Sequence, residues 1–276
     1  MTVPRKVSPL LAILVLLSSA AQSATWTTFD VPGASRTYGM GINAAGDVVG
    51  AYADSSGVHG FLFRANRFTT IDPPGAKSAY AVGINDSGQI AGWFVTKDQH
   101  NHAFLFDASG FTILDLPGAS DTVAQGINNA GEIVGFYKSG GTKAFKWSNG
   151  NFATIDAPGA LSTTLSGIDN LRHVVGVYRD FAQNDHSFIQ NGEGEFRTFP
   201  FKAAVFGIND HRTVVGSGTK NGLSYGFRYI LRTNRFVKLR FPGAVETECF
   251  GINNSGQIVG DYRSPNGKVH GLIRTP

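Results

Sequence analysis

One internal repeat constrains the fold of this chain more than any other feature. The tripeptide Gly-Ile-Asn, once Gly-Ile-Asp, recurs at intervals of about 40 to 44 residues. Its six copies begin at Gly41, Gly83, Gly126, Gly167, Gly207 and Gly251. Each copy continues with a four-residue turn, an apolar pair followed by glycine, and a segment with an aromatic centre. A fixed period of this length indicates copies of one supersecondary unit packed against one another.

Every copy predicts four short strands. The first strand ends at Gly-Ile-Asn, the second carries the apolar pair, and in the first copy the third and fourth cover about 59–64 and 68–72. The turn from Asn85 to Gly88 opens with Asn and closes with Gly, which is typical of a type I turn. No apolar period of 3.6 residues follows the first 23 residues, so helices are not expected. Four strands in about 42 residues is the size of a β-propeller blade.

The two ends of the repeat array predict a closed ring. Residues 26–34 match a fourth strand and its turn, with no first, second or third strand before them. The sixth copy has its first three strands and stops at Pro276. We therefore expect an all-β, six-bladed β-propeller with four-stranded blades of about 42 residues. The N-terminal strand is expected to complete the last blade and close the ring.

The first 23 residues predict a secretory signal peptide. Arg5 and Lys6 form a short basic start, an apolar run covers 10–17, and small residues fill 18–23. This run is too short to span a membrane, and no later segment is apolar enough to do so. The expected domains are a signal peptide at 1–23 and a single propeller at 24–276. The mature chain is expected to be secreted or periplasmic, and monomeric.

Charge and cysteine content exclude some classes of function. The formal net charge of +4 falls to about +2 without the leader, and the basic residues are scattered, which argues against a nucleic-acid partner. Cys249 is the only cysteine, so no intrachain disulfide is available and packing must supply the stability. We expect Cys249 to be a small buried hydrophobe.

The repeat resembles a known class of bacterial sequence. Gly-Ile-Asn-x-x-Gly-x-Ile-Val-Gly, followed by His102-Ala103-Phe104, is similar to the HAF-type extracellular repeats, which are named for that tripeptide. The resemblance covers about 25–276. It implies export and a repeat-built β fold, and it carries no activity or site residues.

Pairs of residues 13 positions apart should face each other across the third and fourth strands of a copy. The expected pairs are His59 with Asp72, His102 with Asp115, Lys143 with Asp156 and, across the closed ring, His270 with Asp30. One interpretation is a hydrogen bond that ties the outer strands together. The other is a repeated His–Asp general base, which is disfavoured because a catalyst rarely needs four copies. In the fourth copy, His186 would face the region of Pro200 instead of an acid.

The histidines also raise the question of a metal site. His100 and His102 could share one face of a strand. Equivalent histidines of different copies are too far apart to converge on one ion. We expect neither a metal nor a cofactor.

Ligand contacts are expected at the mouth of the central channel. If the first strand of each copy is innermost, its start should rim the channel on the face that carries the loops between copies. The candidate ligand-binding residues there are Arg36, Tyr38, Lys77, Tyr80, Asp121, Lys202 and Glu246. Mixed charge with aromatic rings suits a polar ligand such as a glycan. A solvated rim without a ligand is the alternative.

The fourth and fifth copies depart from the repeat. Arg172 and Arg212 replace the turn glycine, and the fifth copy enters through Phe199-Pro200-Phe201-Lys202, which lacks the usual Gly-Ala. An irregular geometry or a binding feature is expected there.

The sequence favours a binding or scaffold module over an enzyme. No convergent catalytic set is present, so no catalytic residue is assigned. The expected partner is a polysaccharide or a protein of the cell envelope or the extracellular space. The alternative is a glycan-active hydrolase or lyase that uses the channel mouth, supported by the irregular fourth and fifth copies. Fold alone does not decide between the two.

Overall fold

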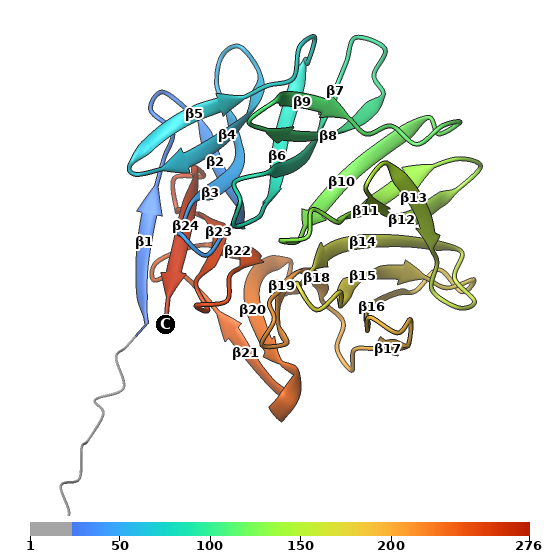
Figure 1. Cartoon of the computed structure of the whole chain (residues 1–276). Helices are drawn as coiled ribbons and strands as arrows, with labels where there is room; N and C mark the ends of the chain where they lie inside the picture. The colour runs from blue at the N-terminus through green and yellow to red at the C-terminus, as the bar shows by residue number, and fades with distance from the viewer. Residues whose placement is uncertain (1–23) are drawn as a thin grey trace, which may run out of the picture.

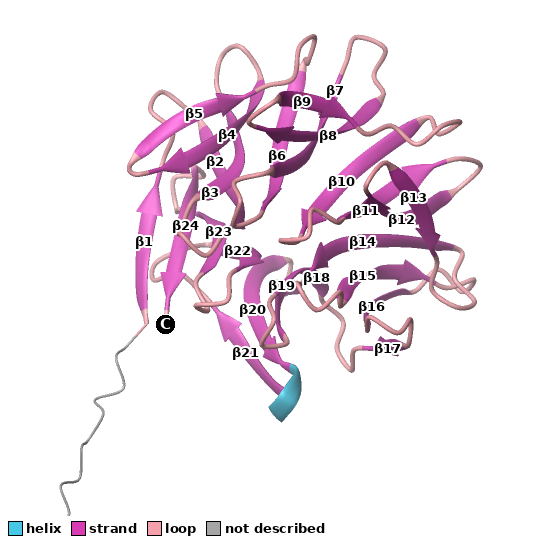
Figure 2. Cartoon of the chain, viewed as in Figure 1, coloured by secondary structure: helices cyan, strands magenta, loops and turns pink. Residues whose placement is uncertain are grey.

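The structure is a computed structural model that describes residues 24–276, and it is built from strands (Figures 1 and 2). The predicted signal peptide at 1–23 lies outside these residues. Apart from one 3-10 turn at Leu231–Thr233, the described chain has no helix, and the all-β prediction is confirmed. No segment within residues 24–276 forms a helix with the length and apolar character needed to cross a membrane.

The strands group into six units of four, which we number in chain order. Units one and two contain β2 (Arg36–Ile42), β3 (Val48–Ala53), β4 (Val58–Arg64), β5 (Arg67–Ile71), β6 (Ser78–Ile84), β7 (Ile90–Val95), β8 (Asn101–Asp107) and β9 (Gly110–Ile113). Units three and four contain β10 (Asp121–Ile127), β11 (Ile133–Lys138), β12 (Thr142–Ser148), β13 (Asn151–Ile155), β14 (Ser162–Ile168), β15 (Val174–Arg179), β16 (Asp185–Gln190) and β17 (Phe196–Thr198). Units five and six contain β18 (Ala204–Ile208), β19 (Thr213–Lys220), β20 (Leu223–Ile230), β21 (Arg235–Leu239), β22 (Glu246–Ile252), β23 (Ile258–Arg263), β24 (Val269–Thr275) and β1 (Thr25–Phe29).

Within each unit, consecutive strands pair antiparallel, and the units surround a common centre (Figure 1). Units three, four and five are separate four-stranded sheets. Units six, one and two are joined into a 12-stranded sheet by two parallel pairings of one residue each, Arg36 with Val269 and Val58 with Ser78. The N-terminal β1 completes unit six, because it pairs antiparallel with β24 along its whole length.

The repeated turn between the first and second strands has the expected geometry. In unit one, the N–H of Gly46 donates to the carbonyl of Asn43 at 3.1 Å, and Gly46 has a φ of +83°. This left-handed conformation favours glycine because a Cβ crowds the following carbonyl. Arg172 and Arg212 adopt the same conformation in units four and five, with φ of +64° and +55°.

The core lies mainly between neighbouring units. Each cluster of buried side chains combines residues of two units, as when Val49 and Ile71 of unit one meet Ile84 and Phe94 of unit two. The third strands supply its five largest fully buried side chains, which are Phe61, Phe104, Phe145, Phe188 and Phe227. Full burial of one such side chain stabilises a fold by about 1.5–3 kcal/mol. The units therefore depend on one another for most of their stability.

A ring of six glycines explains the repeated Gly of Gly-Ile-Asn. A Cβ built on Gly167 would lie 2.6 Å from the carbonyl oxygen of Phe206 and 3.2 Å from the Cα of Gly207. The contact runs on around the circle to unit one, since a Cβ on Gly251 would lie 3.2 Å from the Cα of Gly41. The first strands are thus innermost, as predicted, and approach too closely for any side chain.

A circle of hydrogen bonds lies beside the glycines. The Nδ2 of Asn85 donates to the carbonyl of Asn128 in the next unit at 3.1 Å. The same link occurs at Asn43, Asn128 and Asn209, and Asn253 of unit six donates to the carbonyl of Asn43 in unit one at 2.9 Å. The circle is interrupted at Asp169, whose carboxylate has no amide hydrogen to donate.

Candidate functional site

The central axis offers little room for a ligand. Two small cavities lie on it, of about 90 Å³ on the turn side and about 80 Å³ beside the glycines. Liquid water occupies about 30 Å³ per molecule, so each cavity has the size of a few waters. A saccharide cannot enter past the glycine ring, and any glycan site has to lie elsewhere.

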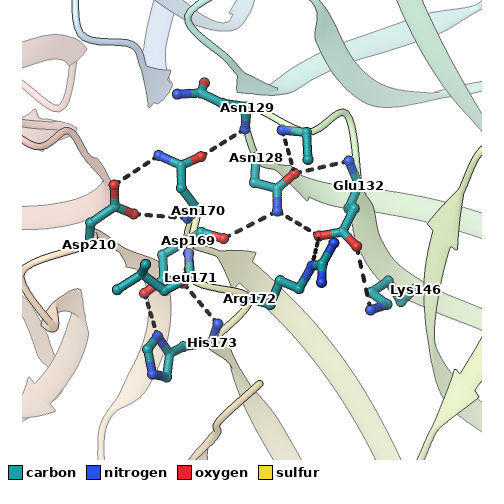
Figure 3. Close-up of polar contacts among 11 residues, drawn as sticks. Asn128, Asn129, Glu132, Lys146, Asp169, Asn170, Leu171, Arg172, His173 and Asp210 are labelled. Carbon is teal, nitrogen blue, oxygen red and sulfur yellow. Dashed lines mark hydrogen bonds and ion pairs between the residues drawn. The ribbon is translucent and has the colours of Figure 1, made fainter. Parts of the chain in front are cut away.

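The turn face carries a continuous polar network (Figure 3). The backbone N–H of Asn129 donates to Oδ1 of Asn170 at 2.8 Å, and that of Asn170 donates to Oδ1 of Asp210 at 2.8 Å. Partial burial acts to raise the pKa of Asp210, but hydrogen bonds from Asn170 and Asn254 outweigh it and hold this pKa below its usual value. These polar groups are used to join neighbouring units.

Unit four departs from the network in a defined way. The carboxylate of Asp169 stands where the other units have Asn, and it accepts from the N–H groups of Leu171 and His173. It also lies 2.8 Å from Nδ1 of His173. Burial is the largest effect on Asp169 and raises its pKa in spite of these bonds. The His173 side chain is therefore held in place by a buried acid, as Figure 3 shows.

The predicted rim residues lie in the seams between units, away from the cavities on the axis. Asp121 accepts from the N–H and Nδ2 of Asn101, and Glu246 accepts from the N–H of Ser224 at 3.3 Å. Arg36 lies in the seam between units six and one, where its backbone pairs in parallel with that of Val269. The start of each first strand rests on the third strand of the preceding unit, and only its last residues reach the axis. None of the seven predicted ligand-binding residues lines either of the two cavities on the axis.

The predicted tyrosines form part of one seam. Tyr80 stacks on Trp93 with ring centroids 4.1 Å apart. Burial, and secondly the phenol of Tyr38 in the neighbouring unit, raise the pKa of Tyr80. The structure thus brings Tyr38 and Tyr80 together, while Lys77 is exposed and its N–H donates to the carbonyl of Val95.

Three of the four predicted cross-strand pairs make hydrogen bonds. The Nδ1–Oδ2 distances are 2.6 Å for His59 and Asp72, 2.7 Å for His102 and Asp115, and 2.8 Å for His270 and Asp30. The second ring nitrogens face the hydroxyls of Ser56, Thr96 and Ser264. Within residues 24–276, Lys143 and Asp156 form no ion pair with each other. The imidazoles of these three pairs have both nitrogens occupied.

His186 is bound differently. Its Nε2 lies 2.8 Å from Oδ2 of Asp180, which takes the place of the hydroxyl in the other units. On the other side, the N–H of Phe199 donates to the carbonyl of Ser187, which sets Pro200 opposite His186 where Asp72 stands in unit one. No group among residues 24–276 makes a hydrogen bond to Nδ1 of His186.

Asp180 is well suited to hold this histidine. Hydrogen bonds, first from His186 and then from the N–H of Asn184, lower the pKa of Asp180 to about 2. An ionised carboxylate only accepts, so Nε2 of His186 donates to it; in the neutral form of the imidazole, Nδ1 is then an acceptor without a partner. Sequence reasoning missed this arrangement, although the amino-acid sequence carries its signal as an acid aligned with Thr96 and Ser264.

A cavity of about 860 Å³ lies beside His186, between units four and five. It opens where the β15–β16 loop meets the β17–β18 loop, the face on which ligand contacts were predicted. Its lining residues are Val177, Gln183, Asn184, Asp185, His186, Ser187, Phe199, Pro200, Phe201, Lys202, Ala203 and Ala204. Lys202 is the one predicted ligand-binding residue among them.

The irregular fifth copy produces this cavity. The outer strand β17 has three residues, and the segment after it lacks the usual Gly-Ala turn. Phe199 and Phe201 stack there with centroids 5.1 Å apart. Phe201 also packs edge-on against Phe227 at 5.3 Å. The cavity therefore has a fixed aromatic wall opposite polar side chains.

Two further groups bear on chemistry. Burial raises the pKa of the Cys249 thiol to about 12, and this residue is a buried, unreactive side chain. Asp261 is buried with Oδ2 lacking a hydrogen-bond partner among the described residues. Burial, followed by the charges of Glu248 and Glu246, raises its pKa well above the usual value. In the part of the chain that the structure covers, no cluster of His, Cys, Asp or Glu is placed to hold a metal ion.

Comparisons with known proteins show the fold. No protein-family model and no curated protein matches this sequence. Among solved structures, a fungal lectin from Aleuria aurantia, in complex with Fucalpha1-6GlcNAc, is similar with a TM-score of 0.57 and 12% identity, over 90% of this chain and 93% of the lectin. A PQQ-bound aldose sugar dehydrogenase from Streptomyces coelicolor has a TM-score of 0.52 and 11% identity, over 91% and 98%. TolB from Acinetobacter baumannii has 0.55 and 10%, over 87% of this chain and 54% of TolB. At these identities the likeness establishes a β-propeller fold, and it leaves the activity to the site.

Proposed function

We propose that this chain is an exported, six-bladed β-propeller of the HAF-repeat type that binds a glycan in the cavity between units four and five. The six four-stranded units and the pairing of β1 with β24 support the blade count. The similar fungal lectin is described as a six-bladed propeller that recognises fucose. The leader-like residues 1–23 support a secreted or periplasmic location.

The chemistry of the cavity suits a saccharide. Its volume of about 860 Å³ falls within the range of about 300–1,000 Å³ that is typical of ligand pockets. The ring of Phe201 is partly exposed and offers an apolar surface against which the C–H groups of a sugar pack, while Phe199 is buried and stacks on it. Lys202 donates hydrogen bonds, and Nδ1 of neutral His186 accepts one from a sugar hydroxyl.

The single observation that carries the proposal is the open Nδ1 of His186. In units one, two and six the equivalent imidazole has both nitrogens occupied and ties strands together. In unit four, Nδ1 has no hydrogen-bond partner among the described residues, and His186 lines the large cavity. A structural role alone does not require this change.

A glycan array followed by titration calorimetry tests the proposal. His186→Ala and Lys202→Ala should each weaken binding of the best array ligand at least tenfold, since each removes a direct contact. His102→Ala is the matched control, because it removes the equivalent imidazole of unit two and should leave binding unchanged. Binding to no glycan, or equal binding by all three variants, would contradict the proposal.

A glycan-active hydrolase or lyase is the second candidate, favoured by the same pair. Asp180 fixes the Nε2–H of His186 and leaves Nδ1 as a proton acceptor, an arrangement that suits a general base. Incubation with a panel of polysaccharides tests it by release of reducing ends or of unsaturated products. Turnover that disappears in His186→Gln would support an enzyme, and turnover retained in this variant would rule out His186 as the base.

Export is tested separately from ligand binding. The mature chain isolated from an expressing bacterium should begin at Ala24, which mass spectrometry measures. A protein partner of the cell envelope is the alternative to a polysaccharide. Recovery of a cytoplasmic chain that retains Met1 would contradict export.

A further inference from the structure

A second, smaller cavity lies on the opposite face, in the same seam between units four and five. It has a volume of about 240 Å³ and opens on the side of the tight turns. Its lining residues are His173, Ile189, Asn191, Glu195, Phe196, Arg197, Arg212 and Leu231. Its position separates it from His186 and the larger cavity.

The preceding seam shows what normally occupies this position. There, Nε of Arg172 lies 3.2 Å from Oε2 of Glu132, and Nζ of Lys146 lies 3.6 Å from Oε1. The carboxylate of Glu132 thus sits between two cations of neighbouring units (Figure 3). Partial burial acts against ionisation, but the hydrogen bond from Asn128 and these two charges lower the pKa of Glu132.

In the seam between units four and five, the arginine is kept and the carboxylate is lost. Arg212 has the turn position of Arg172, and His173 has the position of Glu132. The imidazole cannot replace the acid, because its Nδ1 is bound to Asp169 and its Nε2 carries no negative charge. Within residues 24–276, neither Arg212 nor Arg197 forms an ion pair.

The backbone at Arg212 is also in a conformation that disfavours arginine. Its φ is +55°, and the turns of units one, two, three and six have glycine at this position. At Arg172 the same conformation is offset by the ion pair with Glu132. At Arg212 the described structure offers no such compensation, which is the pattern seen where a strained residue contacts a ligand.

We propose that this cavity binds the carboxylate of a small organic acid, such as a sugar acid, in the place that Glu132 takes in the preceding seam. Arg212 and Arg197 contact the carboxylate, for which the planar guanidinium offers two parallel donors. Ile189, Phe196 and Leu231 form the apolar wall. The lining also contains the carboxylate of Glu195, which accepts from Nδ2 of Asn191 at 2.8 Å, so that the two arginines exceed the acids of the cavity by one charge.

Calorimetric titration with D-galacturonate tests the proposal, with D-galactose as the uncharged comparison. Arg212→Gly should weaken galacturonate binding at least tenfold, and it should fold because glycine is the usual residue of this turn. Arg172→Gly is the matched control and should bind as the parent does, because its guanidinium is paired with Glu132. Equal affinity for the two sugars, no binding of galacturonate, or unchanged binding in Arg212→Gly would overturn the proposal.

The two cavities are distinguished by crossed variants. His186→Ala should leave galacturonate binding at Arg212 unchanged. If His186→Ala lost galacturonate binding and Arg212→Gly retained it, the acid would bind in the larger cavity and the second site would be refuted. Arg212→Lys keeps the charge without the paired donors and should fall between the parent and Arg212→Gly. Binding by Arg212→Lys at or above the parent affinity would also count against the proposed contact.

Discussion

The ring of glycines makes one strong prediction about stability. Gly167→Ala places a Cβ 2.6 Å from the carbonyl oxygen of Phe206, whereas nonbonded carbon contacts are favourable at about 3.5–4.0 Å. The obstacle is backbone of a neighbouring unit, so the two inner strands must separate by about 1 Å. Overpacking in a rigid interior costs about 1–3 kcal/mol, and we expect about 3 kcal/mol here because no side chain can rotate away.

Thermal unfolding followed by circular dichroism measures this effect. For a chain of this size, 3 kcal/mol corresponds to a Tm lower by about 6–12 °C. Gly141→Ala is the control, since a Cβ there meets nothing within 4 Å and the backbone is not left-handed. Both substitutions reduce the entropy of the unfolded chain equally, so their difference isolates the clash. An equal Tm for the two variants would refute the tight glycine ring.

Three further effects are expected. In urea unfolding, Asp261→Asn should stabilise the protein by an amount that grows from pH 4 to pH 8. The pKa of Asp261 is raised in the folded state, so its contribution to stability is present at low pH and is lost as the pH rises and the carboxyl group ionises in the unfolded chain. A difference in unfolding free energy between the variant and the parent that stays constant with pH would contradict this reasoning. Phe29→Ala should cost about 3–5 kcal/mol, because this buried ring packs between units six and one; a loss below about 1 kcal/mol would show that β1 adds little. Arg212→Gly should raise the free energy of unfolding by about 1 kcal/mol and Arg172→Gly by less, because the latter also loses the pair with Glu132; the reverse order would contradict the role of that pair.

The architecture could be predicted because the repeat encodes it many times. The turn of Asn43 to Gly46 and its copies marks the boundary of the first two strands in each unit, and the structure places the strands accordingly. The offset of the end strands predicted that the N-terminal segment 26–34 supplies the missing strand of the last unit, and β1 pairs there. In these elements the turn residues and the apolar pattern indicate the same structure, so the strands could be predicted from the sequence alone.

Where the predicted ligand-binding residues lie in the fold could not be predicted in the same way. Arg36, Asp121 and Glu246 are at the start of inner strands, and strand order alone suggested a place on the channel rim. How far a strand tilts from the axis depends on the packing of whole units. Neighbouring units approach so closely at the axis that a Cβ on Gly167 would lie 3.2 Å from the Cα of Gly207. The starts of the first strands instead meet the third strands of the preceding units, as in the pairing of Val58 with Ser78.

The fourth and fifth copies were correctly singled out, but the shape of their seam was not foreseen. The cavity beside His186 depends on how far the segment from Phe199 to Ala203 departs from the repeated turn. Departure from a repeat shows where geometry changes and does not specify the new geometry. The exchange of a hydroxyl for Asp180 was visible in the sequence and would have identified His186 as the unusual histidine.

The pairing of β1 with β24 has a consequence for the order of folding. These strands are the first and last of the described chain, so their contact has a far greater sequence separation than the hairpins within the units. Closing so long a loop costs conformational entropy before the contact contributes any stabilisation, so such contacts form late. Until then, β24 presents an unpaired strand edge that another chain can occupy. A slow phase of refolding, and exchange of β1 between two molecules at high concentration, are therefore properties to look for in this protein.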